Sequence, residues 1–192
     1  MKKLVFAILL VGLAGISKAQ LAEILTDLYI EPMKTREYKN YTGYALEKYF
    51  LYTGEGKEGL YSYIVNRNSG AKIFELDERD LKARRHKPRF FGMDQDQTTV
   101  IVCLSLEDDY SWGSHILILE DGKVYHPGFI RYGVDNFNFA SIGLYAQFEK
   151  QENGYHMFFQ EDARLINYAT EKIIPGANVE FLVTREKITR LK

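Results

Sequence analysis

Cysteine is almost missing from this chain, since Cys103 is the only one among 192 residues. One cysteine cannot close an internal disulfide, so the small disulfide-stapled extracellular modules are excluded. The chain also shows no internal repeat, which argues against a propeller. Its length is enough to bury a full-sized hydrophobic core, and we expect that core to provide the stability.

Long apolar runs are equally scarce. Leu4–Ile16 is the only one, and it is too short to span a bilayer comfortably. Lys2-Lys3 precedes it, and Ser17-Lys18-Ala19 follows with small residues at the positions that signal peptidase recognises. This pattern predicts a secretory signal peptide at residues 1–19. The alternative is an uncleaved membrane anchor, which a run this short and this rich in small residues disfavours.

A surplus of charge of either sign is lacking too. Removing the three lysines of the signal peptide leaves 22 basic and 26 acidic residues, a net charge of −4. Non-specific nucleic-acid binding needs a basic surplus, so nucleic acid is not an expected partner. We predict that residues 20–192 form a single β-rich domain. Its expected location is the periplasm or the outside of the cell, without stable membrane insertion once the signal peptide is cleaved.

What the chain does contain is a series of short strand signals. The stretch His115–His126 is apolar and turns back at Asp121-Gly122, where Asp-Gly tolerates the positive φ angles of a type I′ hairpin. Thr98–Leu106, just before it, has the composition of a buried strand. Turn signals at Asn68-Ser69-Gly70 and Glu152-Asn153-Gly154 indicate two further hairpins. We predict a mainly β fold, an antiparallel β-sandwich or barrel of roughly 9–10 short strands.

Three segments do not fit a strand pattern. Leu21–Tyr29 carries apolar residues at helical spacing and ends before Pro32, which predicts an N-terminal helix packed on the sheet. Asp162–Lys172 indicates a short helix. Gly128–Ser141 is rich in Gly, Asn and aromatic residues and indicates an ordered loop.

Two histidines flank the predicted hairpin. With Asp121-Gly122 as the turn, alternation places His115 and His126 on one face as diagonal neighbours, with Cα atoms about 7–8 Å apart. Two imidazoles at that separation can share a metal ion if a carboxylate completes the set. Asp109, close in sequence, is the acid we assign to it. The alternative is that both histidines are simply half-buried at the wet end of an apolar face.

The stretch Ser114–His126 resembles the histidine strand of NlpC/P60-type cysteine peptidases and their permuted relatives. The resemblance implies that His115 pairs with a cysteine at a helix N-terminus, where the helix dipole favours the thiolate. Cys103 departs from that pattern, because its neighbours Val100–Leu104 read as a strand and no cysteine follows the histidine. We therefore expect Cys103 to be a buried, inert side chain.

Two groups of side chains are candidates for binding a partner. Aromatic residues in predicted loops can anchor an interface or stack on sugar rings, and the alternative is that they cap the β core. These residues are Tyr110, Trp112, Tyr132, Phe137 and Phe139. A basic loop at Arg79–Arg89, which includes Arg84 and Arg85, can attract an anionic partner or can simply be solvated.

No catalytic set with all its members emerges from the sequence. We therefore predict an exported, non-enzymatic binding protein without a cofactor, recognising a protein partner in the cell envelope in an inhibitor-, immunity- or assembly-like role. The first alternative is a metal-assisted hydrolase that uses His115 and His126. The second is a carbohydrate-binding module that uses the aromatic loops.

Overall fold

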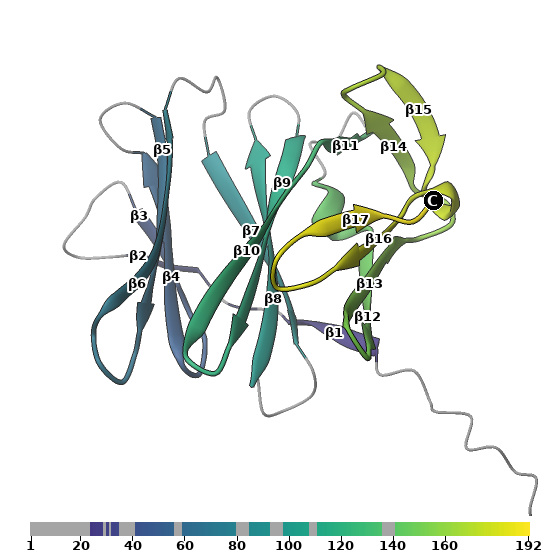
Figure 1. Cartoon of the computed structure of the whole chain (residues 1–192). Helices are drawn as coiled ribbons and strands as arrows, with labels where there is room; N and C mark the ends of the chain where they lie inside the picture. The colour runs from purple at the N-terminus through teal and green to yellow at the C-terminus, as the bar shows by residue number, and fades with distance from the viewer. Residues whose placement is uncertain are drawn as a thin grey trace, which may run out of the picture.

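The computed structural model describes residues 24–28, 30, 32–34, 41–55, 59–79, 85–92, 98–107, 111–135 and 141–192. In this part of the chain the fold is mainly β, and all strand pairs are antiparallel, as predicted. Figure 1 shows the sheets as successive layers, with the N-terminal strands in blue on one side and the C-terminal strands in yellow-green on the other.

The first layer is a five-stranded meander in which each strand pairs with its neighbour in the chain. Its strands are β2 (Pro32–Lys34), β3 (Tyr41–Ala45), β4 (Tyr49–Glu55), β5 (Gly59–Asn66) and β6 (Lys72–Arg79). Burial alternates along β5, so one face of this sheet is buried and the other is partly exposed.

The remaining long strands form one nine-stranded sheet in the order β10-β9-β8-β7-β1-β12-β13-β16-β17. Its strands are β1 (Ile24–Leu28), β7 (Arg85–Gly92), β8 (Thr99–Glu107), β9 (Ser111–Glu120), β10 (Lys123–Ile130), β12 (Ala146–Gln151), β13 (Gly154–Phe159), β16 (Glu180–Val183) and β17 (Ile188–Arg190). The sheet folds back on itself, so β7–β10 face β12, β13, β16 and β17 across a shared core (Figure 1).

Strand β8 lies in the middle layer, and every one of its nine residues is buried. Its side chains alternate between two cores, since strand side chains point to opposite faces in turn. Val100, Val102 and Leu104 pack against the five-stranded sheet, whereas Ile101 and Cys103 pack against the C-terminal strands. A strand buried on both faces explains why Thr98–Leu106 is a nearly continuous apolar run, and Cys103 is buried as expected.

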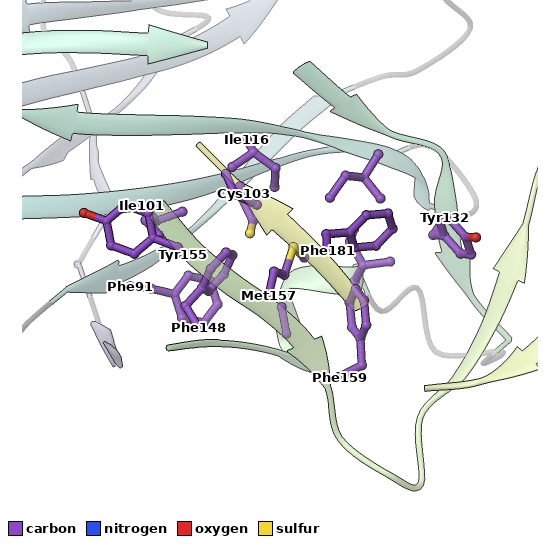
Figure 2. Close-up of a cluster of buried hydrophobic side chains, with 14 of the residues drawn as sticks. Phe91, Ile101, Cys103, Ile116, Tyr132, Phe148, Tyr155, Met157, Phe159 and Phe181 are labelled. Atoms are coloured by element: carbon purple, nitrogen blue, oxygen red, sulfur yellow. The ribbon is translucent and has the colours of Figure 1, made fainter. Parts of the chain in front are cut away.

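We call the core on the C-terminal side the phenylalanine core. It contains Phe91, Ile101, Cys103, Ile116, Phe148, Met157, Phe159 and Phe181. Figure 2 shows these side chains converging from both halves of the folded sheet, with the rings of Phe91 and Phe148 4.8 Å apart. The core on the other side, which we call the leucine core, contains Leu46, Tyr49, Leu51, Ile64, Phe90, Val100, Val102, Leu104, Leu117 and Leu119.

A small third sheet covers one end of the phenylalanine core. Its strands are β11 (Tyr132–Val134), β14 (Arg164–Asn167) and β15 (Lys172–Pro175), in that order. Two single-turn 3₁₀ segments, η1 (Ile142–Leu144) and η2 (Gly176–Asn178), connect the neighbouring strands. No helix in the described part of the chain is long and apolar enough to cross a membrane.

The predicted N-terminal helix is wrong. Residues 24–28 of that segment form β1, which pairs with β12 through Ile24 and Leu25 and with β7 through residues 26–28. Leu25 enters the phenylalanine core, while Leu28 packs against the leucine core. Pairing on both sides outweighs the weak local preference for helix, because propensity yields to tertiary contacts.

Three further predictions need correction. Asp162–Lys172 is not a helix, since it contains β14 and the turn that leads to β15. Gly128–Ser141 is not a loop in its described part, where β10 and β11 continue the sheets. Within Arg79–Arg89, predicted as a basic loop, Arg79 ends β6 and residues 85–89 belong to β7, while residues 80–84 lie outside the described residues. In each case backbone pairing with a neighbouring strand of the sheet decides the conformation of the described residues.

The central hairpin is confirmed. Asp121 and Gly122 have φ angles of 50° and 76°, as a two-residue type I′ turn requires. Lys123 pairs with Glu120 and Val124 with Leu119, the register that the turn predicts. The Gly122 N–H donates a 2.8 Å hydrogen bond to the Tyr49 hydroxyl, which joins the hairpin to the five-stranded sheet.

Candidate functional site

The structure brings the two flanking histidines into contact. His115 Nδ1 and His126 Nε2 are 3.0 Å apart, on the face of β9 and β10 that looks toward the five-stranded sheet. A register shift between Tyr125 and Gly128 inserts an extra residue opposite Leu117. Such a bulge re-aims side chains, and the His126 ring lies against that of His115 with centroids 5.0 Å apart.

The other nitrogen of His115 contacts a carboxylate from the opposing sheet. His115 Nε2 makes a short contact with Oε1 of Glu78, which lies near the end of β6. Burial acts to raise the pKa of Glu78, but the contacts with His115 and His86 outweigh it and lower the pKa to about 2. Glu78 is therefore a carboxylate at neutral pH, held between two imidazoles.

His86, on β7, completes the network on its buried side. Its Nε2 is 3.5 Å from Glu78 Oε2, and its Nδ1 is 2.6 Å from the Ser62 hydroxyl oxygen. His86 is 4% exposed and Ser62 is 1% exposed, so neither is open to a substrate. Burial lowers the pKa of His86, with Glu78 acting in the opposite direction. A connected polar chain thus runs from buried Ser62 to His126, which reaches the surface.

This network can hold a proton or a cation, but it is poorly suited to nucleophilic catalysis. Ser62 lies against Nδ1 of a histidine and is closed off from solvent, whereas an attacking serine must reach its substrate. No group of three His, Cys, Asp or Glu side chains within the described ranges is arranged to hold a metal ion. Asp109, the acid assigned to the metal site, lies outside those ranges.

A second feature is an aromatic patch on the outer face of the five-stranded sheet. We call it the tyrosine face, and it consists of Tyr41 (β3), Phe50 and Tyr52 (β4), and Tyr61 and Tyr63 (β5). All five side chains are partly exposed, while their neighbours along β4 and β5 point into the leucine core. The rings contact one another both along and across the strands, with centroids 4.8–6.3 Å apart.

Charged groups border the tyrosine face. The Arg67 guanidinium lies 4.8 Å from the Phe50 ring centroid, and the Lys72 ammonium lies 5.9 Å from that of Tyr61. The Tyr61 hydroxyl donates a 3.0 Å hydrogen bond to Glu75. An aromatic centre with a charged rim is the composition that protein interfaces favour.

Of the aromatic side chains that the sequence singled out, the structure describes Tyr132 and Trp112. Tyr132 is only 6% exposed and packs in the phenylalanine core, so its prediction as a surface contact is wrong. Trp112 is 40% exposed on β9, with its ring 6.3 Å from that of Tyr168. Tyr110, Phe137 and Phe139 lie outside the described residues.

Two of the basic residues of Arg79–Arg89 lie next to a buried carboxylate. Arg85 is exposed, and its Nε donates a 3.2 Å hydrogen bond to the buried carboxylate of Glu107. Lys87 lies 3.7 Å from the same carboxylate. Burial raises the pKa of Glu107, and the two cations counter only part of that rise. Arg84 is outside the described residues.

Sequence reasoning missed Glu78, His86 and Ser62 as partners of His115. They are 29 to 53 residues away from it along the chain. The packing of the two sheets brings Glu78 and Ser62 to His115, and His86 lies two strands away in the same sheet. The tyrosine face left a clearer signal, because Tyr61 and Tyr63 alternate with buried residues along β5. Comparison with known proteins finds no family, no curated sequence and no solved structure that matches this chain.

Proposed function

We propose that this protein is an exported, non-enzymatic binding protein that recognises a protein partner of the cell envelope through its tyrosine face. The layered sheets act as a sandwich-like scaffold for that face. Tyrosine supplies a large, rigid contact area with a polar tip at a low cost in side-chain entropy, and it is enriched in binding hot spots. The single observation that supports the proposal is this continuous aromatic patch, which the core does not cover.

The ring orientations favour a protein over a sugar. Tyr52 and Tyr63 are a cross-strand pair whose rings stack at 4.8 Å with an interplanar angle of 20°. Side chains on a strand stand roughly perpendicular to the sheet, so these two rings offer their faces to each other. A sugar ring needs an open aromatic face for stacking, whereas a protein interface can use ring edges and hydroxyl groups.

Site-specific photo-crosslinking tests this proposal. A photoreactive phenylalanine analogue replaces Tyr63 in one variant and Ile173 in a matched control, because Ile173 is 50% exposed on β15, away from the tyrosine face. In cells of the native host we expect position 63 to crosslink to one discrete envelope protein and position 173 not to do so. Equal crosslinking from both positions, or none from position 63, contradicts the proposal.

The carbohydrate alternative predicts a different result. Trp112 is the only tryptophan of the chain, so its fluorescence reports on one place in the molecule. A saturable change in that fluorescence with cell-envelope oligosaccharides, together with no protein crosslink from position 63, favours a carbohydrate-binding module.

The metal-assisted hydrolase is the second candidate, and one observation favours it: His115 and His126 are in contact. Hydrolysis also requires a bound metal with an open coordination position for water. Whether the two histidines bind a metal can be tested separately from any reaction.

A further inference from the structure

The contact between His115 and His126 has an unusual arrangement of protons. His115 Nε2 faces the Glu78 carboxylate, so this nitrogen carries the proton in the neutral ring. The His126 ring hydrogen-bonds the Gly128 backbone, and because its Nε2 faces His115, Nδ1 is the nitrogen left for that bond. A neutral imidazole has only one N–H. The two nitrogens that face each other at 3.0 Å are then both left with lone pairs.

When both rings are neutral, two lone pairs at that distance repel, and a proton or a metal cation between them removes the repulsion. Two nitrogen ligands at about 2.1 Å from one tetrahedral metal ion are about 3.4 Å apart. The observed 3.0 Å therefore needs only a few tenths of an ångström of ring movement. His126 is at the surface, so such movement is open to it and an ion can enter from that side.

We propose that His115 and His126 bind one divalent transition-metal ion of the zinc and copper class, with Glu78 as the carboxylate that orients His115. Imidazole nitrogen is a ligand that these ions prefer, whereas Mg²⁺ and Ca²⁺ prefer oxygen. The described residues supply two ligands, and water takes the remaining positions in this account. The site is independent of the tyrosine face, which lies on the opposite surface of the five-stranded sheet.

The surroundings of the pair hold both imidazole rings in place. A carboxylate on the outer N–H of a metal-bound histidine fixes the ring and its tautomer. Glu78 is itself held in place, since its second oxygen faces His86, which in turn contacts Ser62. Phe129 packs on the His115 ring at 4.6 Å and Phe74 meets the His126 ring edge-on at 5.8 Å, so both imidazoles are supported on their apolar sides.

Metal titration of the purified chain tests the site. Calorimetry with Zn²⁺ is expected to show one equivalent bound, and Mg²⁺ is expected to show none. Electron paramagnetic resonance of the chain with one equivalent of Cu²⁺ is expected to show coupling to two imidazole nitrogens. His126→Ala, a change at the surface that leaves the core intact, is expected to remove both signals.

Two more variants make the test specific. His156→Ala removes an imidazole from β13, where His156 lies between Glu149 and Glu180, and binding should be unchanged. Glu78→Gln should weaken Zn²⁺ binding by about 10- to 100-fold, as removal of an outer carboxylate does. The site is overturned if the chain binds no Zn²⁺ at millimolar concentration, if His126→Ala binds like the wild type, or if His156→Ala loses binding. Wild-type affinity in Glu78→Gln overturns the role of Glu78.

Discussion

The two hydrophobic cores on either side of β8 differ in the polarity of the side chains at their ends. The phenylalanine core joins the two halves of one folded sheet with aromatic and aliphatic side chains. The leucine core joins two separate sheets and gives way, at one end, to the chain of Ser62, His86, Glu78 and His115. One side of the same strand therefore faces an apolar interior, while the other side faces an interior that ends in ionisable groups.

The two cores therefore have different roles: one mainly stabilises the fold, and the other fixes the position of one sheet on the other. Apolar packing is non-directional and tolerates small shifts, whereas a buried carboxylate between imidazoles demands a defined position of one sheet on the other. We infer that the phenylalanine core supplies the larger share of the stability. The polar end of the leucine core fixes how the five-stranded sheet sits on β7–β10.

The largest effect is expected from emptying the phenylalanine core. Phe148 is fully buried and its ring contacts that of Phe91 at a tilt of 55°, so Phe148→Ala leaves a cavity that the surrounding strands cannot fill. We expect a loss of about 3–5 kcal/mol in the free energy of unfolding, measured by urea denaturation. A loss below about 2 kcal/mol would show that this core does not dominate the stability.

Removing the charge of Glu78 is expected to have the next largest effect. Its pKa is about 2 in the fold against an ordinary value of 4.5, so its contribution is present above pH 4.5 and is lost as the pH falls toward 2. Glu78→Gln should cost about 2–3 kcal/mol at pH 7, and the gap to the wild type should close below pH 4.5. Urea denaturation across that pH range measures the difference in unfolding free energy between the two proteins. A difference independent of pH contradicts the role assigned to the Glu78 charge.

A smaller loss of stability is expected from breaking a pair of buried serine hydroxyls beyond the phenylalanine core. Ser105 and Ser114 are fully buried, and their hydroxyl oxygens are 2.7 Å apart on β8 and β9. Ser105→Ala leaves the Ser114 hydroxyl without this partner and should cost about 1–2 kcal/mol. The double variant Ser105→Ala/Ser114→Ala should recover part of that loss. Strictly additive losses in denaturation experiments would show that the two hydroxyls do not interact.

The smallest effect on stability is expected on the tyrosine face. Tyr63 is partly exposed and contributes mainly its cross-strand contacts, so Tyr63→Ser should cost about 0.5–1 kcal/mol. Thermal unfolding followed by circular dichroism measures this, and the same variant should lose the partner found by crosslinking. A large loss of stability would mean that this face is structural rather than a binding surface.

Local signals predicted the parts of the fold that depend on neighbours in sequence. The Asp121-Gly122 turn and the apolar run of β8 could be predicted because turn chemistry and burial on both faces leave direct traces in the chain. The hairpin placed His115 and His126 near each other, but the bulge between Tyr125 and Gly128 was not predicted. The helix predicted at Leu21–Tyr29 was wrong, because the spacing of its apolar residues also fits a strand that contributes one side chain to each of two cores.

The rest of the candidate site could not be predicted, for a physical reason. Glu78 and His86 look like ordinary members of a charged stretch, and nothing nearby in sequence marks Glu78 as partly buried or His86 as buried. Their environment is created when β6 and β7 bring two sheets together. The alternation that indicates which face a residue occupies does not tell which other sheet that face will meet.

Strand β1 has a consequence for how the chain is assembled. It is the first described strand to leave the ribosome, yet its partners are residues 90–92 of β7 and residues 148–149 of β12. The nine-stranded sheet is therefore incomplete until most of the polypeptide has been synthesised. Closing such long loops is slow, so we expect the meander β2–β6 to form early and β1 to be inserted late.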